Sequence, residues 1–368
     1  MKFKIVILLG ILLSFICPKS LVANTNCTGI TLNSSDGSFI HARTMEWGAF
    51  NIKPELLVFP RNYAFEGQLP IDKPGMKWEG KYGFIGINAL GDTRVADGLN
   101  EKGLAVSVLY LPGYASYQAF DSTAVDSTIS PSEFPLLLLS TCQSVKEVRV
   151  ILNKVKVVGK PEKELGGIVA PFHYMVSDQT GESVIVEYTK EELHIYDNAV
   201  GVITNSPEYP WHLTNLKNYI TLKTEEAHPV NVGELTLKPF GAGSGMLGLP
   251  GDYTPPSRFV RATVMRNSVI ELEDGERAIS EAFRILNNFD IPIGTMGVDH
   301  DPSVLGDTQY TTAADTKSMR YYYRTMNNHR IRVLDLKKID FTSKELTRRL
   351  LDIELAQDYE FIEIETSK

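Results

Sequence analysis

The stretch "CTGITLNSSDGSFIHARTMEW", residues 27 to 47, decides the fold. Apolar and polar residues alternate on both sides of "SSDG", and alternation with a period of two is typical of β-strands. Asp36 and Gly37 form a dipeptide that accepts the backbone angles of a tight hairpin turn. The stretch therefore predicts a β-hairpin, with Cys27 at the start of its first strand and Arg43 near the end of its second.

The residues before this hairpin have the pattern of an export signal. Lys2 and Lys4 precede the apolar run "IVILLGILLSFI", residues 5–16. At about 1.5 Å per residue this run spans ~18 Å as a helix, short of a hydrocarbon core of ~30 Å. An uncleaved membrane helix is the alternative to a signal peptide. We predict a signal peptide over residues 1–23 and a short propeptide, also removed, over 24–26.

The remaining chain is expected to fold as a single domain, residues 27–368. The whole sequence has 368 residues, 43% of them hydrophobic and 22% charged, which is ordinary for a globular protein. It contains no fixed-period repeat and no long Pro/Gly/Ser linker. The net charge of −8 argues against nucleic acid or an anionic membrane surface as a partner, so we expect a small-molecule ligand. No stretch after the apolar start is apolar enough for stable membrane insertion. The predicted location is exported, either periplasmic or secreted.

Further hairpins and several helices are predicted along the chain. Two more alternating segments with central turns occur at 172–189 and 319–336. Two helices are expected from S-x-x-E capping boxes and two from apolar spacing. The two capping boxes begin at Ser130 and Ser144. The two helices expected from apolar spacing cover residues 257–272 and 278–289. Groups of strands separated by groups of helices predict a layered α+β fold.

Glycine-rich and serine motifs in the second half of the chain do not support a nucleotide site or a serine nucleophile. Gly243, Gly245 and Gly248 have the G-x-G-x-x-G spacing, but Pro250 follows where the phosphate-binding helix would continue. We interpret this segment as a glycine-rich turn. Ser244 lacks the two flanking glycines of a G-x-S-x-G nucleophile turn.

A metal site is the weaker hypothesis for the motif Asp299-His300-Asp301. These residue types bind metals, but no second histidine lies at helical spacing and no H-E-x-x-H occurs in the chain. A polar loop is the favoured interpretation. A metal hydrolase that uses His300 remains an alternative.

Cys27 has the chemistry of an N-terminal nucleophile. The predicted mature chain keeps Cys27 and Cys142, too few for a disulfide framework. If processing ends directly before Cys27, this residue carries a free α-amine with a pKa near ~7.7 to 8. Such an amine can take the thiol proton and act as general base. Arg43, on the paired strand, is placed to favour the thiolate.

Simpler roles remain open for the same residues. A free cysteine is commonly a small buried hydrophobe, and an arginine is commonly part of a surface ion pair. A lipid-anchored Cys27 is a further alternative, although lipidation normally needs a small residue where Asn26 stands.

Six segments in order carry a resemblance to a known family. They are "CTGITL", "ARTMEW", "FPRNY", "ADGLNEKGLAVSVLY", "GVITNSPEYPWHLTNL" and "LGLPGDYTPPSRFVRATV". With them the chain resembles the choloylglycine hydrolase family, which contains bile salt hydrolases and penicillin V acylases and belongs to the N-terminal nucleophile hydrolases. The resemblance implies a four-layer αββα sandwich, maturation that exposes Cys27, hydrolysis of a non-peptide amide, no metal or organic cofactor and, commonly, a homotetramer.

The resemblance also assigns the catalytic residues. The nucleophile falls on Cys27 and the first arginine on Arg43. The asparagine of "TNSP" falls on Asn205, and the arginine of "PSRF" on Arg258. Taken alone, Asn205 would be a turn residue; within the set, its side-chain amide is expected to donate to the oxyanion. Glu46 stands where the family usually has aspartate, and we expect it to hydrogen-bond the α-amine of Cys27.

The substrate is less determined by the sequence than the reaction. Tyr110 occupies the "VLY" position where bile salt hydrolases typically carry asparagine and penicillin V acylases carry tyrosine. Trp47 and Tyr114 are expected to extend the same apolar wall, with ordinary core positions as the alternative. The expected function is an exported, penicillin V acylase-like cysteine amidase. The alternatives are a conjugated bile salt hydrolase, an N-acyl homoserine lactone acylase, and a secreted binding protein that lost catalysis through Glu46.

Overall fold

The structure is a computed structural model that describes residues 26–48, 52–71, 73–89, 93–297 and 305–362. The predicted signal peptide, 1–23, and the first two residues of the predicted propeptide lie outside the described residues. No helix in these ranges is both long and apolar enough to cross a membrane.

The predicted opening hairpin is confirmed, and it lies inside a six-stranded sheet. β1 pairs antiparallel with β2, and Gly29 lies opposite Arg43. β16 adds to the outer side of β1, and β21 to the other side of β2. In spatial order the strands are β16 (Val202–Ile203), β1 (Thr28–Asn33), β2 (Phe39–Glu46), β21 (Thr308–Asp315), β22 (Arg320–Thr325) and β23 (Arg332–Asp335).

An eight-stranded sheet lies against the first. The two other predicted hairpins are confirmed: one pairs β13 with β14 in this sheet, and the other pairs β22 with β23 in the first. The spatial order is β15 (Glu192–Asp197), β14 (Ser183–Thr189), β13 (Phe172–Ser177), β8 (Ala105–Tyr110), β7 (Val95–Asn100), β6 (Phe84–Asn88), β3 (Glu55–Phe59) and β24 (Thr347–Leu350).

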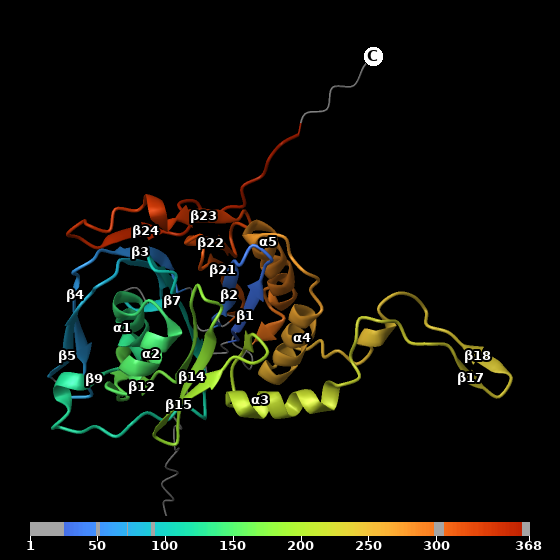
Figure 1. The fold of residues 1–368 in the computed structure, drawn as a ribbon, viewed down its shortest axis with the longest axis horizontal. Helices are drawn as coiled ribbons and strands as arrows, with labels where there is room; N and C mark the ends of the chain where they lie inside the picture. The colour runs from blue at the N-terminus through green and yellow to red at the C-terminus, as the bar shows by residue number, and fades with distance from the viewer. Residues whose placement is uncertain (1–25, 49–51, 72, 90–92, 298–304, 363–368) are drawn as a thin grey trace, which may run out of the picture.

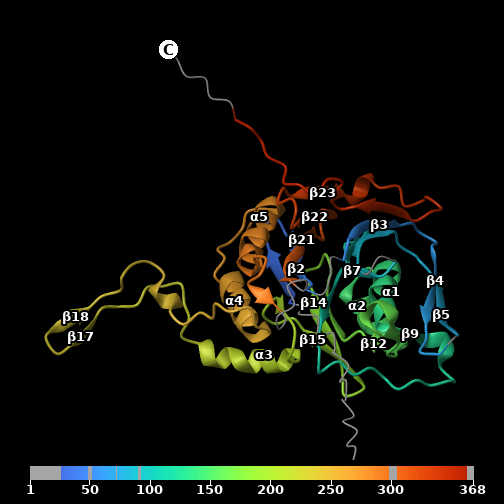
Figure 2. The ribbon, with the colours of Figure 1, turned by 180° about the vertical axis from the view of Figure 1, so that it is seen from behind.

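Helices cover the outer face of each sheet, which completes the predicted αββα sandwich. α4 (Pro255–Asn267) packs on β1, and α5 (Gly275–Leu286) packs on β1, β2 and β21. On the opposite side α1 (Phe134–Thr141) packs on β7 and β8, with α2 (Val145–Leu152) beside it. The two helical layers lie at opposite sides of the paired sheets (Figures 1 and 2).

The helix starts follow the capping chemistry read from the sequence. Ser130 and Glu133 form the reciprocal capping box at the 3₁₀ turn before α1. The Ser144 hydroxyl accepts from the Glu147 amide at the start of α2. Two boundaries differ from the prediction: α4 begins two residues earlier, at a proline pair, and α5 begins at Gly275 because Asp274 caps it.

Short elements complete the chain. A seven-residue helix, α3 (Tyr209–Asn215), precedes an arm that projects from the body and ends in the hairpin of β17 and β18 (Figure 1). The glycine-rich segment is a turn, as predicted, with a short 3₁₀ element at Ser244–Met246. The minor strands are β4 (Ala64–Gln68), β5 (Pro74–Glu79), β9 (Thr128–Ile129), β10 (Lys156–Val157), β11 (Pro161–Glu162), β12 (Ile168–Val169), β17 (Val230–Val232), β18 (Leu235–Leu237), β19 (Met296–Gly297) and β20 (Leu305–Gly306).

Candidate active site

Cys27 lies directly before β1. It lines an apolar pocket, described below, to which both sheets contribute residues. Its side chain is buried, with 3% of its surface exposed. The structure describes the chain with Asn26 still joined to Cys27, so the Cys27 nitrogen is a peptide amide. This amide donates to Oδ1 of Asn205 at 2.9 Å.

Arg43 reaches from β2 across to the eight-stranded sheet. Its side chain is fully buried, so its role is not that of a surface ion pair. Nη2 lies 2.8 Å from Sγ of Cys27, and Nη1 donates to the carbonyl oxygens of Ala96 and Val108 at 3.2 and 2.9 Å. Burial raises the pKa of the Cys27 thiol, and the positive charge of Arg43 acts against that rise.

Asn205 and Arg258 hold the backbone of the nucleophile. Oδ1 of Asn205 accepts from the Cys27 amide and from Nη2 of Arg258, the latter at 2.6 Å, while Nδ2 donates to the Tyr110 carbonyl at 2.8 Å. Two donors on one side and an acceptor on the other fix the orientation of the side-chain amide. Nδ2 therefore keeps one further N–H beside the nucleophile.

Arg258 comes from the first turn of α4 and is 1% exposed. It donates to the Cys27 carbonyl, and also to Oγ1 of Thr28 at 2.9 Å. Nη2 additionally reaches Oδ1 of Asn26 at 3.1 Å. The Arg258 guanidinium thus binds residues on both sides of the predicted processing point. Its planar group with several N–H donors allows these hydrogen bonds to form together.

Glu46 is buried beside the nucleophile, and its expected hydrogen bond to the free α-amine of Cys27 stays a prediction. That nitrogen is a peptide amide here, and its single hydrogen is given to Asn205. Oε1 of Glu46 accepts from Thr308 at 3.1 Å, and Oε2 has no hydrogen-bond partner among the described residues. Burial raises the pKa of Glu46 to about 8.

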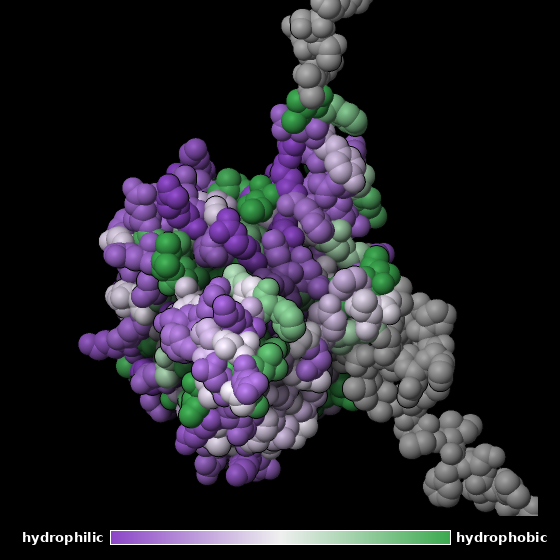
Figure 3. All heavy atoms as spheres, turned by 90° about the vertical axis from the view of Figure 1, so that its right-hand side faces the viewer, coloured by the Kyte–Doolittle hydropathy of each residue, from purple (hydrophilic) through white to green (hydrophobic). Residues whose placement is uncertain are grey.

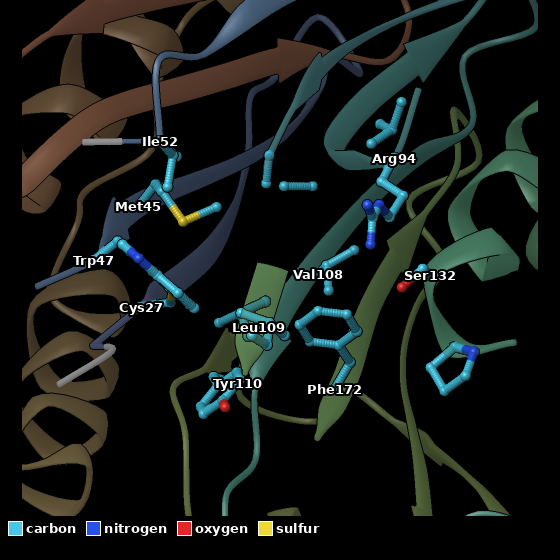
Figure 4. A pocket seen from close by; sticks show the side chains of 15 residues that line it. Cys27, Met45, Trp47, Ile52, Arg94, Val108, Leu109, Tyr110, Ser132 and Phe172 are labelled. Carbon is cyan, nitrogen blue, oxygen red and sulfur yellow. The ribbon is translucent and has the colours of Figure 1, made fainter. Parts of the chain in front are cut away.

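An apolar pocket of about 650 Å³, its open mouth included, begins at Cys27 (Figure 4). Tyr110 and Trp47 lie at the nucleophile's end, with their rings edge-to-face at 6.0 Å, and Tyr110 also meets Phe172. Arg94 lies at the opposite end. The remaining wall is mostly aliphatic and consists of Met45, Ile52, Ala89, Val95, Ala96, Val108, Leu109, Pro131, Ser132 and Leu165.

Comparison with known proteins agrees with this architecture. The sequence profile of the linear amide C–N hydrolases, choloylglycine hydrolase family, matches residues 27–348. The chain belongs to this family. It is 34% identical over 323 residues to the bile salt hydrolase/transferase of Clostridium perfringens, covering 87% of this chain and 95% of the relative. It is 28% identical over 368 residues to the penicillin V acylase of Pectobacterium atrosepticum, covering 92% and 90%.

Solved structures of the choloylglycine hydrolase family share the fold. A variant of the conjugated bile acid hydrolase from Clostridium perfringens aligns with a TM-score of 0.81 and 31% identity, over 92% of this chain and all of that one. The penicillin V acylase from Agrobacterium tumefaciens aligns with a TM-score of 0.72 at 24% identity, over 90% and 94%, which is a likeness of fold. The chain is thus an N-terminal nucleophile amide hydrolase by family.

Not every predicted site residue reaches this pocket. Tyr114 is 41% exposed and lies in the turn after β8, outside the residues that line the cavity, so the expectation that it extends the apolar wall is not met. The chain turns away from the sheet directly after Leu111, whose carbonyl oxygen accepts from the Tyr114 amide. Asp299, His300 and Asp301 lie outside the described residues.

One charged residue near Cys27, Asp97, was not identified from the sequence. Asp97 lies in the middle of β7 with 3% of its surface exposed, close enough to Arg43 for their charges to interact. A signal was present in "VADGLN", where an aspartate stands among apolar residues, because buried carboxylates need a partner.

Proposed function

We propose that the chain is an exported cysteine amidase that cleaves small N-acyl amides through an acyl-thioester on Cys27. The observation that carries the proposal is the 2.8 Å contact between Nη2 of Arg43 and Sγ of Cys27, at the inner end of an apolar pocket. A cation beside a thiol favours the thiolate, which is the nucleophilic form. The apolar pocket gives the acyl group a site shielded from water.

The reaction follows from the positions of these groups. The sulfur attacks the amide carbonyl carbon and forms a C–S bond, while the thiol proton passes to the α-amine of mature Cys27. The remaining Nδ2–H of Asn205 donates to the oxygen that becomes negative. The C–N bond then breaks, and the leaving nitrogen takes the proton back from the α-ammonium. Water cleaves the thioester by the same proton path and restores the thiol.

Removal of residues up to Asn26 is part of this proposal. An α-ammonium at Cys27 has three hydrogens where the peptide amide has one, so it can keep its bond to Asn205 and donate to Glu46 as well. Oε2 of Glu46 is buried without a partner among the described residues, and this is the atom that such a group would satisfy. Loss of Asn26 also frees one donor of Arg258.

Conjugated bile salts are the substrate class we place first. The relative at 34% identity is a bile salt hydrolase/transferase, and the wall that would surround an acyl body is almost wholly apolar. Tyr110 is the residue that favoured penicillin V in the sequence. Its ring packs against Trp47 and Phe172 at the nucleophile's end, away from Arg94, so it leaves most of the cavity to the substrate (Figure 4).

Penicillin V is the second candidate, because a tyrosine at position 110 presents a flat ring next to the scissile bond. An aromatic or linear acyl group would lie against that ring. An N-acyl homoserine lactone has such a linear acyl chain and belongs in the same comparison.

The test combines processing and turnover. We expect protein expressed with its leader to begin at Cys27 by intact mass and N-terminal sequencing. We expect kcat/KM for glycine- or taurine-conjugated bile acids to exceed that for penicillin V by about tenfold, or ~1.4 kcal/mol in transition-state stabilisation. Cys27→Ala should be inactive.

The opposite outcomes are equally specific. A preference for penicillin V or an N-acyl homoserine lactone would make Tyr110 the selecting residue. Activity in protein that still carries Asn26 would rule out the α-amine as base. No turnover of any substrate by correctly processed protein would favour a binding protein of this fold.

We also propose that the enzyme is a homotetramer held in part by the arm between α3 and α4. The arm carries exposed apolar side chains along its length: Ile220, Val230, Val232, Leu235, Leu237, Phe240 and Leu247. It extends away from the body in Figure 1 and points toward the viewer in Figure 3. A two-stranded hairpin is marginal alone, so packing against another copy would stabilise it.

A further inference from the structure

The guanidinium of Arg43 is buried among neutral partners. It donates to the carbonyl oxygens of Thr44, Ala96 and Val108 and to the sulfur atoms of Cys27 and Met45. These contacts fix its place, but a cation without water needs a compensating charge nearby. The chain provides one next to two of these contacts: Asp97 follows Ala96 on β7 and lies opposite Ser107, the neighbour of Val108.

Two hydroxyl groups hold the carboxylate of Asp97 in its ionised form. Oγ of Ser107 donates to Oδ1, and the Tyr321 hydroxyl donates to Oδ2 at 2.5 Å. Burial raises the pKa of Asp97, while Arg43 and these two donors act in the opposite direction. A carboxylate that accepts hydrogen bonds from two hydroxyl groups, and lies close enough to a buried guanidinium for their charges to interact, is a charged partner and not a neutral acid.

The ionised state of Asp97 has a consequence for a chain of hydrogen bonds across the sandwich. Nε2 of His41 lies 2.7 Å from the Ser107 oxygen, and Nδ1 lies 2.9 Å from the Ser177 hydroxyl, which in turn lies 3.0 Å from that of Ser183. Because the Ser107 proton is given to Asp97, the Ser107 oxygen must accept from His41. His41 is therefore the neutral tautomer with hydrogen on Nε2, and burial lowers its pKa to about 3.

We propose that Asp97 is a positioning residue for the nucleophile: its ionised carboxylate offsets the positive charge of Arg43 and so limits how far Arg43 stabilises the Cys27 thiolate. A thiolate that is too stable is a weaker nucleophile, so this limit serves the attack on the amide. The inference rests on the proposed role of Cys27, but it concerns the thiol itself and not the substrate.

The other charged or titratable groups around these atoms come from four elements, β2, α4, β21 and β22. Glu46 on β2, Arg258 on α4 and Tyr310 on β21 act on Cys27 together with Arg43. Arg43, Tyr310 and Tyr321 act on Asp97. Since Arg43 belongs to both sets, a change of charge at Asp97 reaches the thiol through a residue that stays in place.

The test measures alkylation of Cys27 by iodoacetamide across pH, resolved by peptide mass spectrometry in processed enzyme. Asp97→Asn removes one of the two carboxylates that oppose the charge of Arg43 and leaves Glu46 in place. We expect the alkylation midpoint to move to lower pH by at least about 0.5 unit, which is roughly threefold more labelling below the midpoint. Asp97→Glu, which restores the charge, should return the midpoint toward that of the wild type.

Two controls separate this effect from a general disturbance. Glu101→Gln makes the same acid-to-amide change after β7, where the carboxylate pairs with Arg61 at the surface, and should leave the midpoint unchanged. Cys142, buried and with its pKa raised to about 11, should label identically in every variant. An unchanged or higher Cys27 midpoint in folded Asp97→Asn protein would overturn the proposal.

A measurement on the unaltered enzyme keeps the proposal testable if Asp97→Asn does not fold. In ¹⁵N-histidine-labelled protein, with the signal assigned through His41→Gln, we expect His41 to carry its proton on Nε2 near neutral pH. A proton on Nδ1 would mean that Ser107 donates to His41 and that Asp97 is protonated, which contradicts the proposal. Neither readout depends on which amide the enzyme hydrolyses.

Discussion

At the scale of single residues, the site shows why side-chain types alone did not determine its contacts. The sequence placed Cys27, Arg43, Asn205 and Arg258 in one set, and the structure brings the four together. The aspartate in "VADGLN" was a signal for Asp97, but its partner could not be identified before both sheets were in place. The sequence could not indicate the orientation of Asn205, which depends on three atoms from distant segments.

The buried carboxyl group of Glu46 leads to a prediction about how the stability of the unprocessed protein depends on pH. While Asn26 remains attached, the folded pKa of Glu46, about 8, lies above its ordinary value of 4.5. Above pH 4.5 the unfolded carboxyl ionises first, so the unfolded state binds fewer protons and the free energy of unfolding falls as pH rises toward 8. We expect a decline of about 2–4 kcal/mol between pH 5 and 8 in urea titrations of Cys27→Ala protein that retains Asn26.

The matched control for this decline is the same protein with Glu46→Gln added. An amide has no proton to bind, so the difference between the two stability curves should disappear at low pH and grow toward pH 8. Parallel curves would show that Glu46 is already ionised before processing. The presence of Asn26 must be verified by intact mass in both samples.

At the scale of elements, close packing explains the glycine in "CTGITL". Gly29 on β1 lies opposite Ile203 of β16. A Cβ atom at position 29 would come within 2.7 Å of Cγ2 of Ile203 and 3.0 Å of Cε of Met175, which belongs to the facing sheet. β1 therefore lies too near two neighbours for any side chain, and this contact also fixes where Cys27 enters the site.

Substitution of Gly29 tests that account. We expect Gly29→Ala to lower the free energy of unfolding by about 1–3 kcal/mol, because the buried methyl displaces Ile203. Ile203→Ala removes the side chain that the new methyl group would meet. The double variant Gly29→Ala with Ile203→Ala should therefore lose less free energy of unfolding than the sum of the losses in the two single variants. Chemical denaturation of the four proteins in the cycle measures the coupling. Strict additivity would mean that the alanine is accommodated elsewhere.

At the scale of the whole molecule, the sequence predicted the layers better than the strand order. Hairpins and capped helices depend on nearby residues, which is why three hairpins and four helices could be predicted. The strand pairing at the edge of the eight-stranded sheet could not be predicted. There β3 pairs with β24, almost 300 residues later, and no local sequence pattern indicates such a partner. Tyr114 was placed wrongly for a related reason: the end of β8, not its composition, decides which side chains reach the pocket.

The arm gives the last prediction, which concerns assembly. Leu235 and Phe240 are exposed, and a stable interface needs roughly 1,000 Å² of well-packed surface centred on such side chains. If the arm docks on another copy, Leu235→Ser with Phe240→Ser should reduce the tetramer to smaller species in light scattering coupled to size exclusion. Cys27 labelling should persist, since the arm lies away from the pocket. Ile270→Ser, which replaces another exposed apolar side chain, on the body, is the matched control. A wild-type monomer, or the same loss of mass in the control, would contradict the role of the arm.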